Sequence, residues 1–164
     1  MKKEYYFVFH SLLWAGVFTY FITQTLNSTF SAPLLIAISL CISLYLSFRI
    51  FKTQIYQRYI THKFNIDSVC SFFLKFGFVA LLAAPILHFN QLGSIGELQT
   101  IGATVIDKEY SGRYGTYKLK LKHKKETVSI SVNKGFWESH KINSQLNLKI
   151  QRGLLGFYVI DKVV

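Results

Sequence analysis

Acidic side chains are scarce in this chain, with only eight Asp or Glu residues against 19 Lys or Arg among 164 residues. None of the eight falls inside the long apolar runs, so these runs offer no carboxylate for a proton relay or an ion path. The HExxH and GxSxG motifs are missing, and so is a glycine-rich phosphate loop. These absences disfavour a transporter and an intramembrane hydrolase.

Cysteine is also rare, with Cys41 and Cys70 both in the N-terminal half, so no disulfide can staple the C-terminal part. The five histidines fall in five different elements, without the spacing of a metal site. We therefore expect no catalytic residue, no metal site and no cofactor, and we expect that the chain is not an enzyme.

Apolar residues make up 51% of the chain and gather in three long runs. Each run approaches the ~20 residues that a helix needs to cross a bilayer. The first is too long and too aromatic for a cleaved signal peptide. The sequence predicts a transmembrane domain over residues 1–92, with helices at about 5–26, 32–48 and 70–90.

Residues 49–66 repeat apolar side chains at helical spacing among cations, which predicts an amphipathic segment at the membrane interface. The loop before residue 32 carries no Lys or Arg, whereas six cations flank the other helix ends. By the positive-inside rule, the N-terminus is cytoplasmic and three crossings place the C-terminal domain outside the cytoplasm. We expect a multi-pass protein of the bacterial inner membrane. The six cations are Lys2, Lys3, Arg49, Lys52, Arg58 and Lys63.

Residues 98–164 change to short alternating segments separated by turn residues, which predicts an all-β domain of five strands. Five short strands cannot form a sandwich of two full sheets, so a small SH3- or OB-like barrel is expected. Such a small domain is marginally stable alone and gains from packing against helices, membrane or a partner. The expected strands are 101–110, 117–122, 127–132, 146–151 and 155–163.

The most specific surface feature is a stripe of lysines, Lys118, Lys120 and Lys122, with Lys149 expected on a neighbouring strand. Lysines of this kind either protect a strand edge or attract anionic headgroups, an acidic partner or nucleic acid. Phe136 and Trp137 follow a turn between two strands. They either close the end of the barrel or anchor the domain to a partner or to the membrane surface.

In layout, the chain is similar to NfeD-like proteins and other small bacterial membrane proteins in which helices precede an OB- or SH3-like domain. The resemblance carries over no functional residue. The first hypothesis is a non-enzymatic membrane protein whose β-domain docks on another envelope protein or on a second copy of itself. Alternatives are an immunity protein against an envelope-acting toxin, a membrane-tethered nucleic-acid binder, or an enzyme or transporter completed by oligomerisation. No small-molecule substrate is evident.

Overall fold

The computed structural model describes residues 3–54, 68–92, 95–112 and 115–163. Their contacts divide the chain into two compact units. The first holds Met1–Ile22 and Ile36–His88, and the second holds Thr23–Leu35 and Phe89–Val164. The predicted division at 92 and 98 stays a prediction. The structure adds that residues 23–35, where the first two helices meet, group with the β-strands.

Within these described ranges, three helices are long and apolar enough to cross a membrane, as the sequence predicts: α1 (Lys3–Ser28), α2 (Ala32–Phe51) and α4 (Ser68–Leu92). Helices α1 and α4 extend beyond both predicted ends, whereas α2 begins at the predicted residue 32 and extends beyond residue 48. Helix α4 continues through Pro85, where the sequence suggests a bend or an end. Of the predicted amphipathic segment, residues 49–51 complete α2, whereas 55–66 lie outside the described residues.

Many small residues of these helices are buried, and many of their large apolar residues are exposed. On α2, Ser39, Ser43 and Ser47 are buried, while Tyr45 and Phe48 are exposed. In water such an exposed apolar surface would be unfavourable, but it suits hydrocarbon. The three helices and the β-domain together fit a membrane protein that carries a small β-domain.

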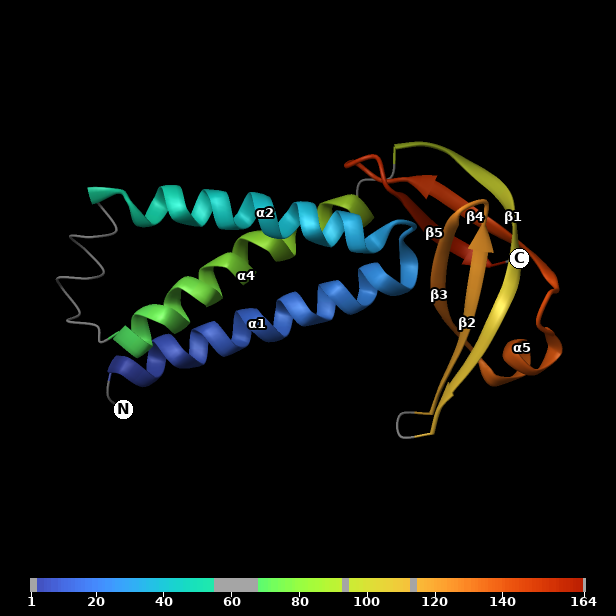
Figure 1. Ribbon diagram of the computed structural model, residues 1–164, viewed down its shortest axis with the longest axis horizontal. Helices are drawn as coiled ribbons and strands as arrows, with labels where there is room; N and C mark the ends of the chain where they lie inside the picture. The colour runs from blue at the N-terminus through green and yellow to red at the C-terminus, as the bar shows by residue number, and fades with distance from the viewer. Residues whose placement is uncertain (1–2, 55–67, 93–94, 113–114, 164) are drawn as a thin grey trace. The chain divides into compact units, whose positions relative to one another are not determined.

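The described residues of the second unit form an antiparallel sheet in the order β3-β2-β1-β4-β5. The long strand β1 bends along its length and pairs with both β2 and β4, so the sheet curls into a half-barrel (Figure 1). The prediction of five strands is confirmed, although β1 begins earlier and β5 begins later than expected. The elements are β1 (Ile95–Ser111), β2 (Thr116–His123), β3 (Glu126–Val132), α5 (Lys134–Ser139), β4 (Gln145–Arg152) and β5 (Tyr158–Val163).

The core of the half-barrel consists of the apolar residues that alternate along each strand. Leu119 and Leu121 on β2 are fully buried, as is Leu148 on β4. Val128 and Ile130 on β3 join the same cluster. Because successive side chains of a strand point to opposite faces, the lysines between these residues lie on the outer face.

The loop between α1 and α2 also belongs to this core. Phe30 is only 3% exposed and packs in the cluster of strand residues. Its backbone N–H donates to the carbonyl oxygen of Tyr158 (3.0 Å), and Thr29 forms a β-bridge with Val159. The hydroxyl of Ser31 donates to Oε1 of Glu126 (2.7 Å). Tyr158 and Val159 are in β5 and Glu126 is in β3, so the loop contacts both edge strands of the sheet.

The last turn of α4 makes a second connection to the sheet. Asn90 is fully buried, and its Oδ1 accepts from the backbone N–H of Leu155 (3.1 Å) in the turn between β4 and β5. A Cβ added at Gly153 in the same turn would lie 2.2 Å from the carbonyl oxygen of Asn90, so this close approach requires glycine. The ends of α1, α2 and α4 are therefore all built into the second unit.

Candidate functional site

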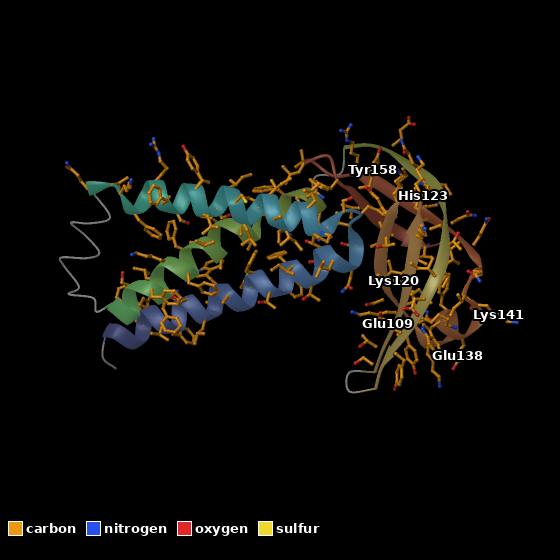
Figure 2. The ribbon with its side chains drawn as sticks, viewed as in Figure 1. Glu109, Lys120, His123, Glu138, Lys141 and Tyr158 are labelled. Carbon is orange, nitrogen blue, oxygen red and sulfur yellow. The ribbon has the colours of Figure 1, made fainter. Side chains whose placement is uncertain are left out.

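The predicted lysine stripe divides into two parts with different surroundings. On the neighbouring strand β1, Glu109 lies directly opposite Lys118, and Asp107 lies directly opposite Lys120. Directly opposite residues share a face of the sheet, so these carboxylates offset the charge of the two lysines. Figure 2 labels Glu109 and Lys120 on the same side of the sheet. Sequence reasoning missed this pairing, because it depends on the bulge between Val105 and Asp107.

The residues directly opposite Lys122 and Lys149 are uncharged or basic instead. Lys122 is exposed and lies opposite Thr104 of β1 and Thr127 of β3. Lys149 lies opposite Thr100 of β1 and also opposite Lys162 of β5, and both lysines are exposed. We call Lys122, Lys149 and Lys162 the basic patch.

Lys162 is a member of the basic patch that the sequence did not reveal. A charged residue near the end of the last strand gives no sign of which strand it adjoins. Its place beside Lys149 follows only from the pairing of β4 with β5, which contains a register shift after Lys149. Asp161, the exposed residue next to Lys162 in the chain, falls at this irregularity between the paired residues Ile160 and Lys162.

Phe136 and Trp137 lie on α5 and pack against the core as partly buried residues. The indole Nε1–H of Trp137 donates to the carbonyl oxygen of Lys118 (3.2 Å), and Lys108 Nζ lies 4.1 Å from the Trp137 ring centroid. The ring of Phe136 stacks on His140 at 4.1 Å between centroids. These contacts favour a role in covering one end of the half-barrel, and a role in partner binding stays a prediction.

Two grooves border the loop between α1 and α2, both within the second unit. The first has a volume of about 510 Å³ and is lined by Phe30 together with Lys124 and Lys125 of the turn between β2 and β3. The second has a volume of about 330 Å³ and is lined by Thr29 and the first residues of α2 together with Lys118 and Lys120. Both volumes suit a small ligand or a lipid headgroup.

Within the described part of the chain, no group of three His, Cys, Asp or Glu residues is placed to hold a metal ion. Comparisons with protein-family models, with curated proteins and with solved structures find no match to this chain. The basic patch, the two grooves and the three apolar helices are therefore the features that bear on function.

Proposed function

We propose that this chain is a small multi-pass protein of the bacterial inner membrane whose β-domain docks on an acidic envelope protein. The β-domain is proposed to lie outside the cytoplasm and to use the basic patch for docking. In this proposal the helices hold the domain at the membrane, and the protein acts without catalysing a reaction.

The observation that carries the proposal is the pairing of Lys149 with Lys162. Like charges directly opposite each other on adjacent strands are destabilising. Both side chains are exposed. Lys122 lies on the same outer face as Lys149, because their partners on β1, Thr104 and Thr100, are an even number of residues apart. A surface with this charge attracts an acidic partner and accelerates its encounter.

The membrane topology in this proposal draws on the loop contacts. Phe30 and Ser31 bind β5 and β3, so the loop between α1 and α2 and the β-domain share one side of any membrane that the helices span. This loop carries no Lys or Arg, whereas the cations flank the opposite helix ends. The positive-inside rule then favours an extracytoplasmic β-domain.

The strand order supports the OB-like alternative for the barrel. In this type of fold, a long first strand pairs with the second and the fourth, and a helix lies between the third and the fourth. The chain has this order, with α5 between β3 and β4. We propose that the domain is an OB-like half-barrel. In a closed barrel β3 would pair with β5, and here the loop between α1 and α2 lies between these two strands and contacts both.

A photocrosslinking experiment in cells tests partner docking. A photoreactive amino acid replaces Lys149 in the full chain, and a discrete crosslinked protein is expected. Reversing two charges, with K122E and K162E, should weaken that crosslink on the order of tenfold, because the electrostatic attraction becomes repulsion. The matched control places the photoreactive residue at Lys141, at the far end of the sheet from His123 and Tyr158 (Figure 2).

The proposal fails if Lys149 and Lys141 positions capture the same set of proteins. It also fails if the charge reversals leave the Lys149 crosslink unchanged, because the contact would then not depend on the basic patch.

A further inference from the structure

Each of the two grooves beside the loop between α1 and α2 contains a pair of lysines. We propose that these four residues, Lys118, Lys120, Lys124 and Lys125, form a lysine collar that binds the phosphate headgroups of anionic phospholipids. The collar is a second site, separate from the Lys149 and Lys162 pair of the basic patch, whereas Lys122 borders the collar because it lies opposite Thr127 of the second groove. This inference does not depend on partner docking.

The depth of the collar follows from the ends of the helices. Apolar helix α1 ends at Ser28 and apolar helix α2 begins at Ala32, so residues 29–31 lie at the surface of the hydrocarbon. The residues on either side of the Lys124–Lys125 turn, His123 and Glu126, both contact this loop. Glu126 accepts the hydroxyl of Ser31, and the ring of His123 lies edge-on to Phe30, at 6.3 Å between centroids. Lysine side chains at this level can reach lipid phosphates.

The first groove combines an apolar floor with a cationic rim. Phe30, Ile101 and Ile150 form the apolar part, and Lys124 and Lys125 provide the charge. Glu126 is the carboxylate in this groove, and it already accepts the hydrogen bond from Ser31. An amphiphile with an anionic head is the class of ligand that matches both parts. A free inorganic anion would leave the apolar floor unused.

The second groove adds polar donors to its two lysines. Thr127 and Ser129 of β3 line it, as does Thr29, which is 1% exposed. The Oγ1 atom of Thr29 is buried and finds no hydrogen-bond partner among the described residues, which is costly unless a ligand supplies one.

The start of α2 strengthens the second groove. Ala32 and Pro33, the first two residues of this helix, line the groove, so the positive end of the helix dipole lies there. Asp107 and Glu109 face the two lysines from β1 but do not line the groove. A phosphate in the groove would therefore approach the lysines from the side of β3.

Native mass spectrometry of the detergent-solubilised full chain tests the collar with short-chain lipids. Dioctanoyl phosphatidylglycerol should bind more tightly than zwitterionic dioctanoyl phosphatidylcholine. The double variants K118Q/K120Q and K124Q/K125Q should each weaken phosphatidylglycerol binding on the order of tenfold, because each removes two cations near the bilayer surface. T29V, which removes only the hydroxyl, should weaken it less.

Two double variants serve as controls. K134Q/K141Q removes two exposed lysines at the α5 end of the sheet, and K149Q/K162Q removes two from the basic patch. Both should retain the lipid affinity of the unchanged protein. An unchanged melting temperature of the collar variants in detergent would show that their β-domain is folded, and retained lipid affinity of K149Q/K162Q would show that the two sites are separate.

Three results would overturn the inference. The first is equal binding of the two lipids, and the second is an equal loss of phosphatidylglycerol binding in the control variants. The third is complete displacement of phosphatidylglycerol by glycerol 3-phosphate, which would show a site for soluble phosphates and not for lipid.

Discussion

Phe30 lies in a loop of three residues between two membrane helices, yet its side chain belongs to the core of the β-domain. The flanking residues Thr29 and Ser31 bind the two outer strands of the sheet. The side chain of Phe30 therefore completes the core of the half-barrel within the second unit. Its burial explains how a small half-open sheet gains the apolar contacts that five short strands alone supply poorly.

We predict that Phe30→Ala destabilises the β-domain by about 3 kcal/mol or more, because it removes a fully buried aromatic ring and leaves a cavity. Thermal unfolding of the detergent-solubilised chain, in a W14F background so that Trp137 is its one fluorescent tryptophan, measures the effect. The matched control is Phe76→Ala on α4, where the ring is 53% exposed. Equal shifts of the melting temperature in both variants would contradict a specific role for Phe30.

At the scale of elements, α1 and α4 approach each other closely at one glycine. A Cβ added at Gly77 would lie 2.7 Å from the Cα of Ser11, which is closer than real Cβ atoms come to a backbone. Small residues of this kind let membrane helices pack backbone to backbone. Gly16 on α1 offers a matched position, since a Cβ added there meets nothing within 4 Å.

We predict that Gly77→Val destabilises the helical unit by roughly 1–3 kcal/mol through overpacking, whereas Gly16→Val is nearly neutral. The melting temperature of each variant in detergent, compared with that of the unchanged chain, gives the answer. If Gly77→Val unfolds at the same temperature as Gly16→Val, the close contact between α1 and α4 does not stabilise the protein.

For the whole molecule, the side of the membrane that the β-domain occupies decides which partners it can reach. The uncharged loop of residues 27–31 and the cations at the opposite helix ends favour an extracytoplasmic position. An acidic envelope protein is then an accessible partner, and cytoplasmic nucleic acid is not.

A pair of reporters fused after Val164, one active only in the cytoplasm and one only in the periplasm, tests this topology. We expect activity from the periplasmic reporter alone, because three crossings carry the C-terminus to the side opposite Lys2 and Lys3. Activity of the cytoplasmic reporter alone would reject the proposed envelope partner. The basic patch would then be available to inner-leaflet lipid or to nucleic acid.

Local patterns in the sequence are enough to predict the long helices and the strands of the fold. The apolar run that begins at Ala32 predicts a membrane helix because hydrocarbon excludes unpaired backbone groups and charges over a fixed length. The alternation from Tyr117 to Lys122 predicts strand β2 with its lysines on the outer face, since the period of a strand is two residues. Both patterns depend on neighbours in the chain.

The arrangement of the candidate sites was decided by contacts between residues far apart in the chain. Strand register placed Lys162 beside Lys149 and set Asp107 and Glu109 against two lysines of the stripe. A shift of register changes every such pairing, and it leaves no mark in a single strand. In the sequence, Phe30 is part of a short connection between two apolar runs. It becomes a core residue because its side chain packs into the open side of the half-barrel. The sequence by itself therefore determined the three long helices and the five strands, and tertiary packing decided which side chains meet.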